Sequence, residues 1–503
     1  MDERSVRKDA VVNSFWYFVA KVIEKAGAVI FTIILARFLL PEGFGVYNLA
    51  MSVVLIATGI LNYSIDNTSM RYVSWAVGKN NKKKSSSYFI YLLKMKFVLI
   101  LIFSILLLIL AYPLSVFVFK KSFLFPILFI SGFYMFVLAF ESSYDVLFYV
   151  FKVVKGKAIK EIFKQTLRIL IVLSIFFIIA KAYYIIGVIV GLILTNIAIL
   201  VFSLLYFRRF AHFISNKEKI KISKGEKKKI LKFFYCLLGT GVAGLTFSYI
   251  DIIMLGIFLP ETRYIGIYSA SISLVLGITG MLGFASVFLP IFIKCKKNKL
   301  GELFNKVLKY SLMIALPIIF GIAAISNYIV FIIYGKEYLE SSVLLTLTSF
   351  LIAEGAVGGI ASAIFYTKEK PGSITKIAVF VLILDIILNV ILINAFLNVS
   401  QLWASIGAAI ATIISRYASL ISLIVVMKKK FKIKINYVNL VKPLLSSVIM
   451  FISLWMLNKF IIKDINLFLG LLEIILGAAI YIFCMLIFKG ISKEELSILK
   501  GVY

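Results

Sequence analysis

Hydrophobic residues occur along this chain in long uninterrupted runs, and polar residues gather in the short segments between them. Most runs reach about 20 residues, which lets an α-helix cross the ~30 Å hydrocarbon layer of a bilayer. Helices are expected rather than strands, because a spanning helix satisfies its own backbone hydrogen bonds and the short alternating segments of a membrane barrel are missing. The pattern predicts an all-α integral membrane protein with about fourteen transmembrane helices.

The expected spans are joined mostly by short connections. They run from 11–38, 44–66, 88–112, 122–150, 160–180, 182–207, 230–259, 264–293, 303–326, 340–366, 373–397, 400–427, 437–460 and 464–488. A basic connection after the sixth span is the longest, and it separates six spans from eight. The predicted organisation is an N-terminal lobe with helices 1–6 over 1–210, a basic cytoplasmic linker over 211–229, a C-terminal lobe with helices 7–12 over 230–427, and helices 13 and 14 with a cytoplasmic tail over 428–503.

Composition and charge placement support a membrane location. The chain is 62% hydrophobic, and its mean hydropathy of +1.04 is far above that of a soluble domain. Its net charge is +32, and most of its 55 Lys and Arg residues fall at alternate connections and helix ends. The positive-inside rule then predicts a multi-pass protein of the cell membrane with both termini in the cytoplasm. Basic loops of this kind contact lipid headgroups, so nucleic-acid binding is not expected.

Residues for metal or nucleotide chemistry are scarce. The three cysteines lie far apart without metal-ligand spacing, and His212 is the only histidine. No nucleotide-binding lysine motif is found, and the glycine-rich stretch around 355–359 lacks one as well. We therefore expect no metal, no cofactor and no enzymatic activity.

Two stretches of the chain repeat each other. The sequence FLLPEGFGVYNLAMS at 38–52 matches IFLPETRYIGIYSASIS at 257–273, and both lie in the predicted outer turn between the first two helices of a half. A weaker match joins VFVFKK at 116–121 to FIIYGK at 331–336. Chance similarity in an apolar sequence is the alternative. Duplication predicts two pseudo-symmetric six-helix repeats plus two C-terminal helices, a transporter architecture whose site lies at the midplane between lobes.

Two further stretches carry a resemblance to a known family. The segment ARFLLPEGFGVYNLAMSVVLIATGIL and the segment VFIIYGKEYLESSVLLTL, at 330–347, resemble the polysaccharide flippases, the O-antigen-export branch of the multidrug/oligosaccharidyl-lipid/polysaccharide exporter superfamily. The resemblance covers nearly the whole chain. It implies a V-shaped two-lobe carrier that moves a polyprenyl-linked oligosaccharide to the outer leaflet by alternating access. The implied partners are a polyprenyl-(pyro)phosphate-linked saccharide, membrane lipids, Na⁺ or H⁺ as coupling ion, and glycan-assembly enzymes.

Basic residues within predicted spans are the candidates for substrate binding, because a charge at membrane depth costs at least ~2.5 kcal/mol and is usually functional. Lys21 and Lys25 share one face of the first span, and Arg416 lies at similar depth in the twelfth. These three cations suit a pyrophosphate group. Asn62 lies on a polar stripe of the second span that suits sugars. Internal salt bridges, including one from Arg416 to Asp385, are the open alternative.

Acidic residues within predicted spans are the candidates for ion coupling. They are Glu141, Asp251, Glu354 and Asp385. A carboxyl group at membrane depth can hold a proton or Na⁺, since desolvation disfavours its bare charge. Hydrogen bonding between helices is the alternative for each.

Three functions compete on these grounds. A flippase for lipid-linked oligosaccharide or polysaccharide precursors is favoured, because cations at depth suit an anionic headgroup. In a cation-coupled multidrug or small-molecule antiporter, we would expect acidic residues within the spans without lysines that compensate their charge. A membrane glycosyltransferase or polymerase would need a sizeable outer loop, and every predicted outer loop is short.

Overall fold

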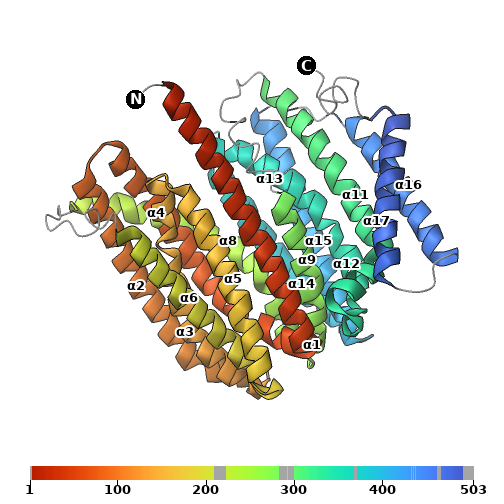
Figure 1. Cartoon of the computed structure of the whole chain (residues 1–503), viewed down its shortest axis with the longest axis horizontal. Helices are drawn as coiled ribbons and strands as arrows, with labels where there is room; N and C mark the ends of the chain where they lie inside the picture. Colours follow the sequence, from red (N-terminus) through yellow and green to blue (C-terminus); the bar gives the residue numbers. More distant parts are fainter. Residues whose placement is uncertain are drawn as a thin grey trace. The chain divides into compact units, whose positions relative to one another are not determined.

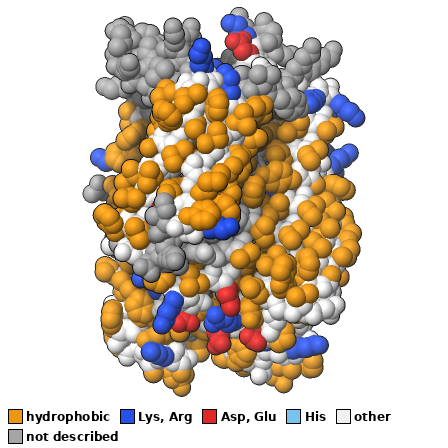
Figure 2. Space-filling view, turned by 90° about the vertical axis from the view of Figure 1, so that its right-hand side faces the viewer, with side chains coloured by type: hydrophobic (Ala, Val, Ile, Leu, Met, Phe, Trp, Pro, Cys, Tyr) orange, Lys and Arg blue, Asp and Glu red, His pale blue; other side chains and the backbone are white. Residues whose placement is uncertain are grey.

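The structure is a computed structural model that describes residues 3–208, 222–282, 292, 299–367, 371–431, 433, 436, 438–460 and 466–490. Within these residues every regular element is helical (Figure 1). The chain forms two compact units, Met1–Gly266 and Ile267–Tyr503. Hydrophobic side chains cover much of the face shown in Figure 2, as expected of a surface in contact with lipid. The protein is therefore an all-α membrane protein, as predicted.

The first unit begins with a long helix that contains a sharp turn. Helix α1 runs Glu3–Gly78, but Leu40 has non-helical backbone angles, φ 58° and ψ 172°. Pro41 follows directly, and a proline pushes the preceding residue away from helical angles while fitting the first turn of the next helix. The turn lies between the predicted spans 11–38 and 44–66, so the sequence located it correctly.

The other helices of the first unit pack around α1. They are α2 (Lys82–Pro113), a π-helical turn η1 (Leu114–Val118), η2 (Ser122–Leu124), α3 (Phe125–Ser142), α4 (Asp145–Val150), α5 (Val154–Ile178), η3 (Lys181–Tyr183), α6 (Tyr184–Arg208) and α8 (Lys224–Phe258). Contacts join α1 to α2, α3, α5 and α8. Helix α8, which the sequence assigned to the second lobe, thus packs within the first compact unit. The lobe boundary at the basic linker stays a prediction.

The second unit contains the remaining helices. They are α9 (Arg263–Leu282), which begins before the unit boundary, α11 (Leu300–Tyr334), η5 (Lys336–Tyr338), α12 (Ser341–Ser349), α13 (Leu351–Thr367), α14 (Pro371–Leu397), α15 (Gln401–Phe431), α16 (Val438–Phe460) and α17 (Leu467–Ile487). The predicted tenth span is divided into α12 and α13 at Phe350. Helix α11 packs against α16 and α17, and α14 packs against α15.

Twelve helices among the described residues are long and apolar enough to cross a membrane. The sequence predicted about fourteen, and the difference has two physical reasons. Helix α1 counts as one of the twelve helices, although the turn at Leu40 divides it into two segments that the sequence predicted as separate spans. Helix α5 is not in the set because its first half carries several charges, which are described below.

The two copies of the outer-turn motif touch through their glycines. A Cβ atom on Gly45 would lie 1.9 Å from the carbonyl oxygen of Thr262, and one on Gly266 would lie 1.9 Å from that of Pro41. Each carbonyl belongs to the residue four positions before the other glycine, so the contact is reciprocal. Only glycine permits so close a backbone approach. The matching glycines of the repeat therefore have a shared structural role.

The weaker repeat also has a structural counterpart. Lys120 and Gly335 occupy matching positions and both have positive φ, 53° and 96°. Lys120 lies between η1 and the short 3₁₀ turn η2, and Gly335 lies between α11 and the short 3₁₀ turn η5. A shared backbone path in both copies supports the interpretation of the two stretches as a repeat.

Candidate functional site

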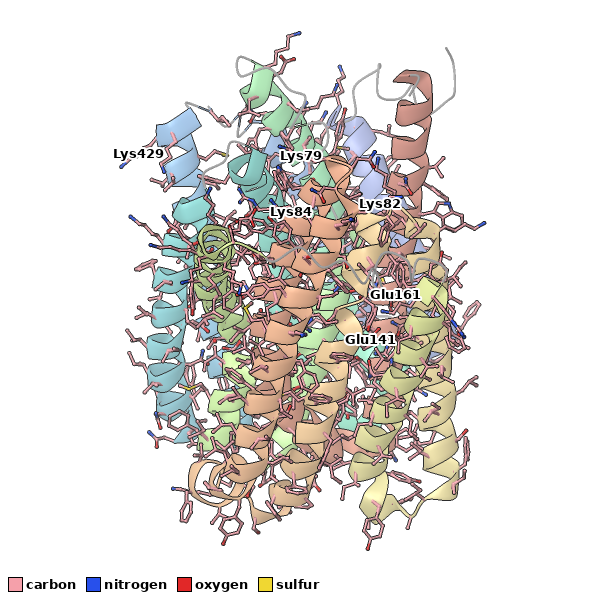
Figure 3. All side chains as sticks on the ribbon, turned by 90° about the vertical axis from the view of Figure 1, so that its left-hand side faces the viewer. Lys79, Lys82, Lys84, Glu141, Glu161 and Lys429 are labelled. Atoms are coloured by element: carbon pink, nitrogen blue, oxygen red, sulfur yellow. The ribbon has the colours of Figure 1, made fainter. Side chains whose placement is uncertain are left out.

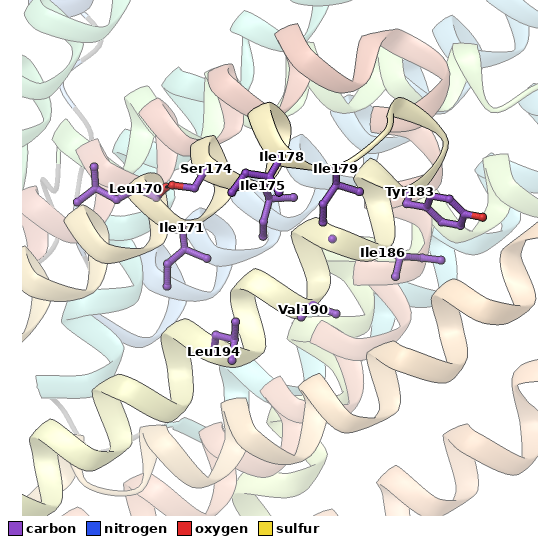
Figure 4. Close-up of a pocket in the computed structure, with 11 residues that line it drawn as sticks. Leu170, Ile171, Ser174, Ile175, Ile178, Ile179, Tyr183, Ile186, Val190 and Leu194 are labelled. Atoms are coloured by element: carbon purple, nitrogen blue, oxygen red, sulfur yellow. The ribbon is translucent and has the colours of Figure 1, made fainter.

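Helix α5 has a polar first half and an apolar second half. Its first half carries Lys157, Lys160, Glu161, Lys164 and Arg168. Its second half lines an apolar groove of about 500 Å³ with α6, formed mostly by isoleucine and leucine side chains (Figure 4). The polar half therefore belongs to the interior of the first unit, and the groove to its apolar exterior.

The polar half of α5 forms a buried ion network with the end of α3 and the start of α4. Lys160, which is 0% exposed, pairs with both Glu141 and Asp145. Lys164 Nζ lies 2.9 Å from the second oxygen of Glu141, and Lys157 Nζ lies 2.7 Å from Asp145. Figure 3 places Glu141 and Glu161 within the bundle, away from Lys79, Lys82 and Lys84 near the start of α2. Opposite charges from these three helices offset the cost of burying each other.

These lysines correct the sequence analysis. It chose Lys21, Lys25 and Arg416 as the basic candidates within spans and assigned most other basic residues to connections and helix ends. Lys96, Lys157 and Lys160 are in fact buried, with exposures of 1%, 5% and 0%. One signal was present in the sequence: the charges of α5 recur every three or four residues, which places them on one helix face.

A second buried pair joins the polar stripe of the second span to α2. Lys96 Nζ lies 2.8 Å from Asp66 and donates a hydrogen bond to the hydroxyl of Ser142. Asp66 lies one helical turn beyond Asn62 on the polar stripe of the second span. Lys96 neutralises the charge of Asp66, and the contacts of Lys96 with Asp66 and Ser142 stabilise the packing of α1, α2 and α3.

The candidate residue Asn62 lies one helical turn before Asp66. Its side-chain oxygen is buried and has no hydrogen-bond partner among the described residues. Buried amide oxygens are normally satisfied, so this atom is available to a hydroxyl donor. A sugar hydroxyl is one such donor, and the role of Asn62 in substrate binding stays a prediction.

The candidate lysines of α1 share a single carboxylate. Lys21 Nζ lies 2.8 Å from Glu24, and Lys25 Nζ lies 3.9 Å from the other oxygen of Glu24. Their side chains are 42% and 44% exposed, whereas Glu24 is 32% exposed. This group has a net positive charge and remains accessible. It differs from the α5 network, where the lysines are enclosed.

In the second unit the candidate cation and one candidate acid lie together. Arg416 Nη1 lies 3.8 Å from Glu354 Oε2, and their side chains are 24% and 13% exposed. The sequence analysis had named Asp385 as the structural partner of Arg416. Asp385 is 0% exposed in α14, and Asn389 donates a hydrogen bond to its backbone carbonyl.

The remaining acidic candidate, Asp251, lies in α8 of the first unit and is 5% exposed. Glu141 contacts two lysines. All four acidic candidates thus lie largely buried in helices, and the described ion pairs include those of Glu141 and Glu354.

Comparison with known proteins identifies the family. The family described as "Polysaccharide biosynthesis protein" matches residues 10–296. A similar curated protein is the "Probable low-salt glycan biosynthesis flippase Agl15" of Haloferax volcanii, 28% identical over 247 residues, which are 46% of this chain and 50% of that protein. This chain therefore spans about half the length of the curated relative it matches.

Solved structures show the fold. The "Lipid II flippase MurJ, inward closed conformation" matches with a TM-score of 0.72 and 17% identity over 95% of this chain and 98% of its own. An inward-facing "multidrug resistance MATE family transporter of the MOP superfamily" matches with a TM-score of 0.61 and 14% identity over 82% of this chain and 95% of its own. Together with the sequence match over more than half its length, these findings show that the chain belongs to the polysaccharide biosynthesis protein family.

Proposed function

We propose that this protein is a flippase that moves lipid-linked oligosaccharide or polysaccharide precursors from the cytoplasmic to the outer leaflet by alternating access. Family membership supports a role in glycan assembly. The curated relative is named a glycan biosynthesis flippase, and the fold is that of transporters, including one named a lipid II flippase. On this proposal the chain is a transporter and carries out no covalent chemistry.

One observation carries the proposal: two lysines at membrane depth share one carboxylate. By helical rise, Lys21 and Lys25 lie ~15–21 Å from the start of the first span, near the middle of a bilayer. Their excess charge and partial exposure suit an anionic phosphate or pyrophosphate headgroup. In the empty carrier, Glu24 lowers the electrostatic cost of holding two cations there.

Asn62 of the first unit and Arg416 of the second are each proposed as a further substrate contact. Arginine binds phosphate oxygens through two parallel N–H groups, and the accepting oxygen of Asn62 suits a sugar hydroxyl. Arg416 Nη1 lies 3.8 Å from Glu354 Oε2. A bound phosphate would compete with Glu354 for the guanidinium group.

Ion coupling is proposed at the acidic candidates of the second unit, Glu354 and Asp385. When a phosphate displaces Glu354 from Arg416, its carboxylate would take up H⁺ or Na⁺. This exchange would link the arrival of cargo to ion binding. We further propose that both termini lie in the cytoplasm of the cell membrane, because this orientation places most basic loops there, and that glycan-assembly enzymes supply the cargo.

The test is a leaflet-exposure assay in proteoliposomes that contain a fluorescent lipid-diphosphate oligosaccharide. The wild-type protein should move the lipid between leaflets, and Lys25→Ala should weaken its binding about ten-fold because one charge-assisted contact is lost. Lys228→Ala, a change in the exposed first turn of α8, is the matched control and should bind normally. Transport of a cationic dye with no movement of the lipid would support the antiporter instead.

A further inference from the structure

Glu473 is the only charged residue of α17, and it lies within the apolar length of that helix. It is six residues beyond Leu467, so ~9 Å of helical rise separates it from the start of the helix. The Glu473 side chain is 0% exposed, whereas Leu472 and Ile474 beside it are 40% and 52% exposed on the apolar exterior. A carboxyl group at this depth is costly unless it is paired or neutral.

No cation of the described residues neutralises Glu473, since none of their ion pairs includes it. Lys459 of α16 is directed elsewhere, because its Nζ atom lies 4.9 Å from the centre of the Trp455 ring. The hydrogen-bonding neighbours of the carboxyl group in the described structure are Asn458 of α16 and Tyr328 of α11. Both are neutral side chains, so the charge of an ionised Glu473 would be left uncompensated.

The hydrogen bonds around Glu473 leave two buried oxygens without a donor. Nδ2 of Asn458 donates to Oε2 of Glu473 at 3.0 Å and to the backbone carbonyl of Ala324 at 3.3 Å, which uses both of its N–H groups. Oε1 of Glu473 and Oδ1 of Asn458 have no hydrogen-bond partner among the described residues. A protonated carboxyl group has an O–H donor that a carboxylate lacks. One proton on Glu473 would therefore remove its charge and add a donor.

Glu473 also lines a cavity of about 300 Å³ that is otherwise apolar. Side chains of α11, α16 and α17 form the wall, among them Ile322, Leu454 and Ile474. The wall residues other than Glu473 carry no side-chain oxygen, whereas a hard metal cation needs several oxygen ligands. The cavity therefore suits a neutral carboxyl group better than a carboxylate with a bound metal ion.

The same hydrogen bonds connect Glu473 to a bend in α11. Ile325 has non-helical backbone angles, φ −119° and ψ 23°, and the carbonyl of Ala324 directly before it accepts from Asn458. Helices α16 and α17 pack against α11 (Figure 1). A single amide side chain thus joins the bend to the carboxyl group, so both respond to the same contact.

We propose that Glu473 is a proton-binding site at the junction of α11, α16 and α17 and is neutral at physiological pH. The proton comes from water and is held on Oε1, while Oε2 continues to accept from Asn458. Loss of the proton leaves an unpaired carboxylate in an apolar cavity, which favours entry of water between α17 and the bend of α11. The site lies on different helices from the coupling candidates Glu354 and Asp385, and it does not depend on which cargo the protein moves.

The experiment treats the purified full-length protein in nanodiscs with dicyclohexylcarbodiimide, a hydrophobic reagent that modifies protonated carboxyl groups. Peptide mass spectrometry then locates the modified residues. At neutral pH Glu473 should be modified at least about ten-fold more than Glu302, an exposed glutamate that is ionised at that pH. Glu141 is the buried control and should resist the reagent, because Lys160 and Lys164 hold it as a carboxylate. Alkaline buffer should abolish the modification of Glu473.

A second measurement is the infrared difference spectrum between the wild type and Glu473→Gln at neutral pH. The wild type alone should show the carbonyl band of one additional protonated carboxyl group. An absent band would overturn the inference, and so would modification that Na⁺ blocks at constant pH, which would assign the site to a metal cation. If Glu473→Gln does not fold, the carbodiimide result on the wild type decides, and an unmodified Glu473 overturns the inference. None of these outcomes bears on the lysine pair of α1, which the proposed function requires.

Discussion

Replacing Glu141 with glutamine tests whether this acid stabilises the fold or binds the coupling ion. Glu141 is 1% exposed and pairs with Lys160 and Lys164. After the change Lys160 still has Asp145, whereas Lys164 loses the carboxylate 2.9 Å away. Leaving a buried charge unpaired destabilises a protein by about 3–5 kcal/mol. Lys164 is 18% exposed, so we expect a loss near the lower value, about 3 kcal/mol.

The assay is equilibrium unfolding of the purified protein in a titration with denaturing detergent. Adding Lys164→Met to Glu141→Gln removes the unpaired charge and should restore about 2 kcal/mol. The matched control is Glu302→Gln, because Glu302 is exposed in the first turn of α11; it should change the free energy of unfolding by less than about 0.5 kcal/mol. Glu141→Gln with wild-type stability but without ion-gradient dependence of transport would refute this reasoning and assign Glu141 to coupling.

Three further predictions address the outer turn, ion coupling and orientation. Gly45→Ala should abolish folding or sharply lower the melting temperature, because its methyl group would meet the Thr262 carbonyl. Gly78→Ala is the control and should leave the melting temperature unchanged, because no atom lies within 4 Å of the added methyl group. Equal melting temperatures for the two variants would disprove the contact. Glu354→Gln should remove the dependence of transport on an imposed ion gradient but keep cargo binding, and unchanged dependence would exclude this carboxylate from coupling. Cysteines at position 336 should react with an impermeant reagent from outside and those at position 228 should not; the reverse labelling would invert the proposed orientation.

The sequence alone predicted the helices and the turn between the first two spans. A helix in lipid depends on local composition, because its backbone hydrogen bonds form within the segment and apolar side chains suffice to bury it. The break at Leu40 is equally local, since Pro41 restricts the residue before it. The repeated motif and the family resemblance could also be recognised from the sequence alone, because both depend only on the order of residues along the chain. Functional residues were harder to predict from the sequence, because the role of a buried charged side chain depends on the residue with which it pairs.

The tertiary structure decided which charges meet and which remain accessible. The pairing of Lys160 with Glu141 and Asp145, and of Lys96 with Asp66, joins separate helices of the first unit. Sequence spacing gives the face of a helix on which a side chain lies, but not which neighbour that face contacts. The sequence thus determined the helices and their order, and helix packing determined the partners of the buried charges, because electrostatic energy depends on distances between atoms that the chain order does not specify.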